Sequence, residues 1–174
     1  MTGLVTSPAA TTTRRPTFHP LTVQQVERLT DEATAITFAV PAELAEVYRF
    51  AAGQHLTLRR VVDGAEVRNS YSICQPARGE LPTSVRVAAA KVPGGRMSPW
   101  LVDEVAVGDV IDVMTPMGTF TCPARLQVPR HHLAIAAGSG ITPVLSLVTT
   151  ALEQEPMSRV TVLFGNRRTA TVMF

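Results

Sequence analysis

The stretch HLAIAAGSGITP (residues 132–143) decides the fold of the C-terminal part of the chain. Residues 132–137 form a short apolar run without alternation, which is typical of a buried parallel strand. A glycine-rich turn follows, and Thr142 and Pro143 suit the N-cap and the first position of a helix. A second apolar strand at 160–164 completes a βαβ unit.

This unit by itself leaves sheet edges unpaired and sheet faces uncovered. From Thr169 the sequence looks like the start of another helix, and there the chain stops. We therefore expect residues 127–174 to be the incomplete N-terminal part of a Rossmann-like nucleotide-binding domain. The exposed sheet edge is predicted to favour aggregation or dimerisation.

The preceding part of the chain has the pattern of short strands separated by turns. Large apolar side chains alternate with smaller or polar ones, and the Asp63-Gly64 pair is a strong hairpin signal. Such a series without long helices predicts a six-stranded antiparallel barrel over 17–126, preceded by a loose tail at 1–16. The expected strands are 18–28, 34–40, 54–62, 67–74, 84–91 and 109–114.

Composition excludes several classes of protein. The chain has 174 residues, is 45% hydrophobic and carries a net charge of +2, which argues against disorder and against charge-driven nucleic-acid binding. Its two cysteines, Cys74 and Cys122, cannot supply the four thiolates of an iron–sulfur cluster, and we expect both to be small core residues without a metal role. No apolar run is long enough to span a membrane, and no signal peptide is recognisable, so we expect a cytoplasmic protein without a membrane partner.

The first motif is RNSYS at 68–72, on the fourth expected strand. By the two-residue period of a strand, Arg68, Ser70 and Ser72 share one face and Tyr71 lies on the other. An arginine can hold a phosphate, a tyrosine can stack on a flat ring, and a serine can reach a ring nitrogen. An ordinary solvated strand with one packed tyrosine is the alternative.

The second motif is PGGRMSPWL at 93–101. Its two glycines allow close backbone approach, and Ser98 and Pro99 suit the N-cap and first position of a short helix. The free N–H groups at such a start attract anions such as phosphate. A plain junction between loop and helix explains the same residues.

Two further motifs flank the helix and second strand of the βαβ unit. The turn AGSGITP at 137–143 would let a dinucleotide lie at the helix N-terminus, although Pro143 stands where a full G-x-G-x-x-G fingerprint has its third glycine. The segment FGNRR at 164–168 follows the second parallel strand, where arginines can reach the adenosine ribose or a 2′-phosphate. A tight turn and solvated surface arginines are the respective alternatives.

Together, in this order and spacing, the motifs resemble the ferredoxin–NADP reductase superfamily. Within it, residues 17–174 are most similar to oxygenase reductases such as the reductase component of phenylacetyl-CoA epoxidases, and Pro116-x-Gly118-x-Phe120 also matches. The resemblance implies an FAD-binding barrel followed by an NAD(P)-binding domain. It implies catalytic roles for Tyr71, Ser72 and Thr142. The implied cofactor-binding residues are Arg68, Tyr71, Ser72, Gly94, Gly95, Arg96, Met97, Ser98, Gly138, Gly140, Thr142, Pro143, Asn166 and Arg167.

The resemblance also implies a function. Its members pass electrons from NAD(P)H through FAD and a [2Fe–2S] centre to an oxygenase or another acceptor protein, here in the breakdown of aromatic compounds such as phenylacetate. No iron–sulfur signature is present, and Ala90 stands where the family often has a lysine, with Lys91 beside it. We therefore expect an NAD(P)H-dependent FAD oxidoreductase whose activity as this chain alone is weak or nil.

The sequence leaves other interpretations open. A non-catalytic barrel that binds another molecule would need a basic groove and several aromatic platforms, and the chain has six Phe, two Tyr and one Trp. A free-standing NAD(P)H:flavin reductase is the other alternative. Arg167 and Arg168 point towards a 2′-phosphate, but the sequence does not decide between NADH and NADPH.

Overall fold

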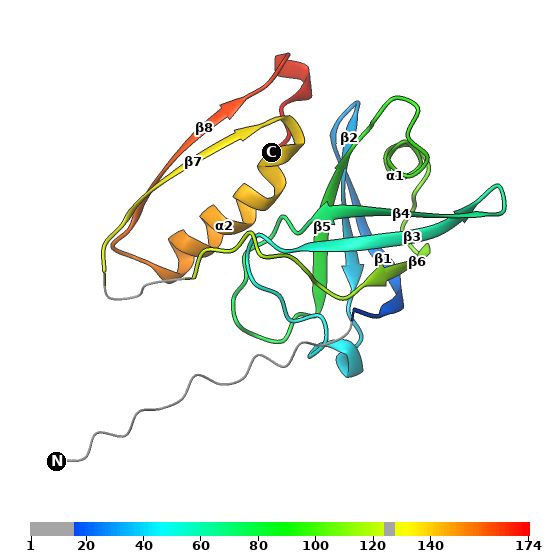
Figure 1. Ribbon diagram of the computed structural model, residues 1–174, viewed down its shortest axis with the longest axis horizontal. Helices are drawn as coiled ribbons and strands as arrows, with labels where there is room; N and C mark the ends of the chain where they lie inside the picture. The colour runs from blue at the N-terminus through cyan, green and yellow to red at the C-terminus, as the bar shows by residue number, and fades with distance from the viewer. Residues whose placement is uncertain (1–15, 124–127) are drawn as a thin grey trace.

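A computed structural model of the protein describes residues 16–123 and 128–174 (Figure 1). Residues 1–15 of the expected tail and the expected boundary at 126–127 lie outside the described residues. The strands are β1 (Phe18–Thr30), β2 (Ala33–Ala39), β3 (His55–Val62), β4 (Ala65–Ser72), β5 (Ser84–Ala90), β6 (Val110–Met114), β7 (His131–Ala137) and β8 (Arg159–Gly165). The helices are α1 (Ser98–Asp103) and α2 (Ile141–Gln154), with short 3-10 turns η1 (Ala42–Leu44), η2 (Gly138–Gly140) and η3 (Thr169–Thr171).

The first six strands form one antiparallel sheet in the order β4-β3-β6-β1-β2-β5. The sheet curls so that its two outer strands approach, and a single bridge joins Ile73 to Val87 next to them. The predicted six-stranded antiparallel architecture is therefore confirmed, as a barrel-like sheet that is not closed by a continuous ladder. Two residues at positive φ, Asp63 at 51° and Gly64 at 74°, make the predicted hairpin between β3 and β4.

The core of this sheet follows the alternation in the sequence. Ile36 and Phe38 on β2, and Leu56 and Leu58 on β3, are fully buried in one cluster. Tyr48 is buried with them, and its hydroxyl donates to the Val113 carbonyl at 2.6 Å. Along β3 the buried Leu56 and Leu58 alternate with residues that are only partly buried, and these remain available for the outer surface.

The parallel pair β7–β8 runs in register from His131 and Arg159 to Ala137 and Gly165. Figure 1 shows α2 between this pair and the curled sheet. A second apolar cluster joins the two parts and consists of Ala33, Ala35, Cys74 and Ala88 from the first part with Ala136, Ile141, Val144 and Met173 from the second. These contacts place the turn after β7 beside the ends of β4 and β5.

Several local expectations were wrong. The helix expected from Thr169 is a single 3-10 turn, after which Met173 is buried in the second cluster. Cys74 is buried as expected, but Cys122 is exposed. No helix in the described part of the chain is long and apolar enough to cross a membrane.

Candidate functional site

A cavity of about 360 Å³ opens between the end of β4 and the turn before α2. It brings together residues from three of the four motifs. Its lining consists of Asn69, Ser70, Tyr71, Ser72, Ala88, Ala90, Val92, Ser98, Ser139, Gly140, Thr142 and Pro143. The walls therefore come from both parts of the chain, and neither part forms this cavity alone.

Tyr71, which carries an aromatic ring and a hydroxyl, lines this cavity. The hydroxyl oxygen is buried and has no hydrogen-bond partner among the described residues. Burial raises the pKa of Tyr71 to about 12, because the phenolate would lose hydration. The side chain thus stays protonated at neutral pH and offers an unused donor beside a flat apolar surface.

Arg68 lies on the face of β4 opposite to that of Tyr71, as the two-residue period of a strand predicts. Its Nε donates to Glu66 at 2.6 Å, and its guanidinium carbon lies 5.1 Å from the centre of the Phe18 ring. The structure does not bring Arg68 to the lining of the cavity. Asn69, for which the motif predicts no role, lines it together with Ser70 and Ser72.

The glycine-rich loop before α1 is tightly folded. A Cβ on Gly95 would lie 3.0 Å from the Val92 carbonyl oxygen and 3.2 Å from Ser98 Oγ, so a side chain at this position would crowd the loop. Gly94 has a φ of +74°, which also favours glycine. The Ser98 hydroxyl accepts a hydrogen bond from the Val92 N–H at 3.0 Å and so closes the loop.

The rest of this motif differs from expectation. The helix begins at Ser98, so Met97 is its N-cap residue and Ser98 is not. Arg96 donates to the Val62 carbonyl at 2.6 Å and lies 3.6 Å from Asp63, which ties the loop to the β3–β4 hairpin. Met97 is buried in the core. Of Gly94 to Ser98, only Ser98 lines the cavity.

The start of α2 also differs by two residues from the prediction. Gly140 is the N-cap residue, and Thr142 already lies inside the helix. Its Oγ1 donates to the Ser139 carbonyl at 2.9 Å, which fixes the turn that borders the cavity. Gly138 has a φ of +51°, which lies in the left-handed region of backbone conformation, so this position of the turn favours glycine.

A larger cavity of about 550 Å³ lies at the carboxyl ends of β7 and β8. Its lining consists of Thr30, Glu32, Ala33, Ala90, Lys91, Ala137, Gly138, Ser139, Gly165, Asn166, Arg167, Arg168, Thr171 and Met173. Ligands of open α/β sheets bind outside these strand ends. Ala90 and Ser139 line both cavities, so the two spaces adjoin.

The larger cavity contains residues that the motifs did not identify as a site. Glu32 comes from the turn between β1 and β2, and Lys91 follows β5. The side chain of Lys91 pairs with Asp103, and the Arg168 guanidinium lies 3.6 Å from the Glu32 carboxylate. The pairing of β2 with β5 sets Glu32 beside Lys91, and the packing of small side chains against the βαβ unit brings both to the strand ends. No local sequence signal marks these contacts.

The residues of the smaller cavity fit a flavin ring. Tyr71 offers a flat face and an unpartnered hydroxyl donor, and Ser72 offers another hydroxyl nearby. The larger cavity, with its glycine turn and basic side chains, fits a dinucleotide. A flavin ring and a nicotinamide bound in adjoining cavities would meet near Ala90 and Ser139.

Comparisons with known proteins identify the two parts of the chain. Residues 20–122 match the family described as oxidoreductase FAD-binding domain, and residues 134–174 match the oxidoreductase NAD-binding domain. The chain is 46% identical to a subunit of the 1,2-phenylacetyl-CoA epoxidase of Escherichia coli (strain K12), over 91% of this chain and 44% of the relative. It is 36% identical to the ferredoxin reductase component of the 3-ketosteroid-9-alpha-monooxygenase of Rhodococcus rhodochrous, over 88% of this chain and 42% of that relative.

Solved structures show the same likeness. The Amycolatopsis cytochrome P450 reductase GcoB matches with a TM-score of 0.73 and 27% identity, over 91% of this chain and 45% of that one. Phthalate dioxygenase reductase matches with a TM-score of 0.72 and 25% identity, over 90% of this chain and 46% of that one. The chain spans less than half the length of these relatives. With the FAD-binding match extending over more than half of its residues, the chain belongs to the ferredoxin reductase-like family of oxidoreductases, with an FAD-binding domain followed by NAD-binding sequence.

Proposed function

We propose that the chain is the flavin- and nucleotide-binding part of a reductase that draws electrons from NAD(P)H and delivers them to an oxygenase. The observation that carries this proposal is the meeting of two cavities at Ala90 and Ser139. Two rings that exchange a hydride must lie in contact, because the reacting atoms have to approach to about 3–3.5 Å. When bound, FAD would supply the chemistry, accepting the hydride and releasing its electrons singly.

In this proposal the chain's own residues position and shield the reacting rings. Tyr71 packs against the flat ring system and donates its hydroxyl to a polar atom at the ring edge or on the attached chain. Ser72 gives a hydrogen bond at the other edge. Thr142, held by the Ser139 carbonyl, fixes the backbone turn against which the nicotinamide would lie.

The diphosphate of the flavin needs N–H donors and close backbone approach. We assign this role to the loop from Gly94 to Ser98, where Gly94 and Gly95 carry no side chain that would keep a phosphate away from the backbone. For the nucleotide, the Gly138–Gly140 turn and the side chains of Asn166 and Arg167 take the corresponding roles. Arg68 is bound to Glu66, and in this proposal it acts on the outer side of the sheet.

The names of the relatives support the choice of electron acceptor. They include a subunit of phenylacetyl-CoA epoxidase, a component of a ketosteroid monooxygenase and phthalate dioxygenase reductase. We propose that the whole protein likewise serves an oxygenase component, of the phenylacetyl-CoA epoxidase type, in the breakdown of phenylacetate. The cytoplasmic location expected from the sequence is part of the same proposal.

The first experiment is a visible absorption spectrum of the purified chain, before and after addition of FAD and removal of the excess. We expect flavin bands that remain with the protein, and we expect the released nucleotide to be FAD. A folded protein that stays colourless at saturating FAD would overturn the proposal. Ser72→Ala should weaken FAD retention, whereas Ser84→Ala, at the far end of β5, should retain FAD as the unaltered chain does.

A further inference from the structure

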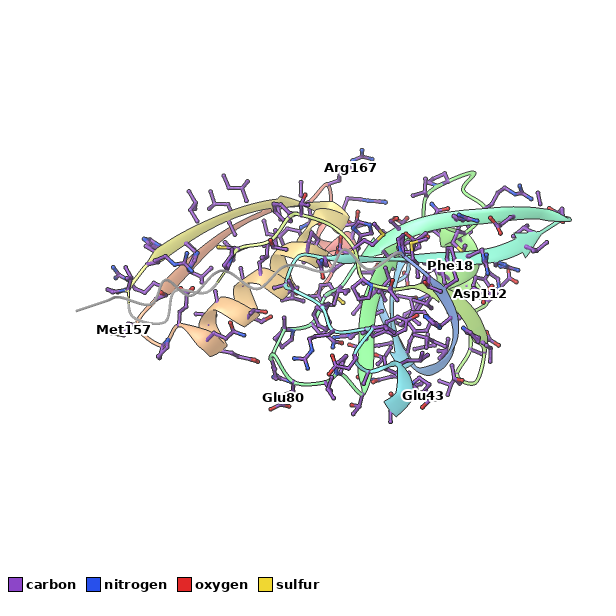
Figure 2. All side chains as sticks on the ribbon, turned by 60° about the horizontal axis from the view of Figure 1, so that its bottom comes forward. Phe18, Glu43, Glu80, Asp112, Met157 and Arg167 are labelled. Carbon is purple, nitrogen blue, oxygen red and sulfur yellow. The ribbon has the colours of Figure 1, made fainter. Side chains whose placement is uncertain are left out.

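Helix α2 carries a stripe of polar side chains along one face. Thr142, Ser146, Thr150 and Gln154 follow one another at intervals of four residues, which places them in one row. The first three are buried although they are polar, and buried polar groups need hydrogen-bond partners. The stripe finds such partners in the connection between β4 and β5, which carries Glu80 and lies beside α2 in Figure 2.

The partners in this connection are backbone groups. The Ser146 hydroxyl donates to the Gln75 carbonyl at 2.7 Å. The Ala77 N–H donates to Thr150 Oγ1 at 2.9 Å, and the side-chain amide of Gln154 donates to the Ala77 carbonyl at 2.7 Å. Successive turns of one helix therefore hold three backbone groups of one short segment.

This segment is itself fixed to the curled sheet. The Cys74 N–H donates to the Arg86 carbonyl at 2.9 Å, and Gln75 Nε2 donates to the Ser84 carbonyl at 3.1 Å. Ser72, at the end of β4, lines the smaller cavity and precedes Cys74 by two residues. The stripe thus binds a segment that continues directly from one wall of the smaller cavity.

The other wall of the smaller cavity is formed by the start of α2. Thr142 lines it, and because α2 is one continuous helix, hydrogen bonds further along the helix fix where Thr142 lies relative to Ser72. The apolar cluster between the two parts is less selective, since burial of apolar surface has no direction whereas hydrogen bonds depend on distance and angle. The nearby ion pair of Arg78 with Glu153 is exposed, and such pairs contribute little.

We propose that Ser146, Thr150 and Gln154 are positioning residues. They hold the turn before α2 at a fixed distance from the end of β4, and so set the width of the smaller cavity and its placement beside the larger one. The inference rests on the proposed function, in which these cavities receive a flavin ring and a nicotinamide. A displacement of about 1 Å between reacting groups can cost about a hundredfold in rate, so this spacing has to be exact to a fraction of that.

The test measures the distance between the two parts by pulsed electron paramagnetic resonance. Spin labels are attached to Val110→Cys on β6 and Leu163→Cys on β8, both exposed positions, in a full chain that also carries Cys122→Ser. We expect one narrow distance distribution. Adding Thr150→Val removes the acceptor of the Ala77 N–H and should raise the fraction of molecules outside this distance about fivefold, the factor by which one net hydrogen bond shifts an equilibrium.

Three further variants make the result specific. Thr150→Ser keeps the hydroxyl and should restore the narrow distribution. Thr149→Val makes the same replacement at the next position, where the hydroxyl donates to the Leu145 carbonyl inside α2 at 2.7 Å, and should also leave the distribution narrow. Ser146→Ala removes a different bond of the stripe and should broaden the distribution independently of Thr150→Val. Circular dichroism at the same temperature identifies the folded chains, in which a broader distance reports displacement and not unfolding.

FAD links this measurement to the proposed function. Saturating FAD should narrow the distribution of Thr150→Val again, because a ligand that fills the space between both walls favours the arrangement that it fits. Equal distributions in Thr150→Val and Thr149→Val would overturn the inference, as would a broad distribution that bound FAD leaves unchanged, and either result leaves the proposed function standing. If the unaltered chain takes up no FAD, the proposed function falls and the inference falls with it.

Discussion

Replacing Tyr71 by phenylalanine separates a role in ligand binding from a role in folding. The Tyr71 hydroxyl is buried without a partner in the described structure. An unsatisfied buried hydroxyl costs about 1–3 kcal/mol, so its removal relieves a penalty. We expect Tyr71→Phe to raise the free energy of unfolding of the FAD-free chain by about 1 kcal/mol.

The same change should weaken FAD binding. A hydrogen bond donated to the ligand contributes about 0.5–1.5 kcal/mol net, which corresponds to a loss of affinity of about fivefold. At an FAD concentration of about 100 times the dissociation constant, binding stabilises the unaltered chain by about 2.7 kcal/mol. With fivefold weaker binding the gain falls to about 1.8 kcal/mol, so the two proteins should become nearly equal in stability when FAD is present.

The assay is urea unfolding followed by circular dichroism, with and without FAD. Tyr48→Phe is the matched control, because the Tyr48 hydroxyl donates to the Val113 carbonyl at 2.6 Å. Removing this hydroxyl deletes a buried hydrogen bond and should destabilise the chain by about 1–2 kcal/mol in both conditions. If Tyr71→Phe behaves like Tyr48→Phe, or leaves FAD affinity unchanged, the assignment of the Tyr71 hydroxyl to the ligand is wrong.

Three further changes test other parts of the structure. Gly53→Ala should destabilise the chain by about 3 kcal/mol or more in urea unfolding, because its Cβ would lie 1.9 Å from the Phe120 carbonyl oxygen and φ is +91°. Gly108→Ala, at a φ of +97° with open space around it, should cost only about 1 kcal/mol, and equal losses would contradict the steric argument. Burial raises the pKa of the Cys74 thiol from 9.0 to about 11, so the unfolded chain loses this proton first and stability should fall as pH rises from about 9 towards 11. Unfolding measured at several pH values should show a shallower decline in Cys74→Ala, and an identical slope would refute the assignment. Arg68→Gln should change FAD affinity by less than about twofold in a fluorescence titration, since Arg68 is bound to Glu66 outside the cavity, and a tenfold loss would restore the role that the motif implies.

Local signals predicted most of the fold. Alternation placed Phe38 and Leu58 in the core, and the Asp63-Gly64 pair predicted the hairpin that the structure contains. These features depend on the two-residue period of a strand and on the φ values of turn residues, which act over a few neighbouring positions. The helix expected from Thr169 failed because burial of Met173 against the first part of the chain is a long-range contact.

The candidate site was only partly predictable. The motifs identified Tyr71, Ser72 and Thr142, and these residues meet in one cavity. Arg68 does not line that cavity, although Ser70 and Ser72 share its face of β4 and do line it, and the two-residue period of a strand does not predict this difference. Ser98 and Thr142 were expected as helix caps, but their hydroxyls bond to the loops that lead into α1 and α2.

Periodicity, turn residues and motif spacing are local properties, and they were enough to predict most of the elements, their order and the family to which the chain belongs. Which elements come into contact became clear only from the folded structure. The pairing of β2 with β5 and the packing of α2 on small side chains bring Glu32 and Lys91 to the ends of the parallel strands. Contacts between residues so far apart along the chain follow from the burial of whole faces, which no short stretch of sequence encodes.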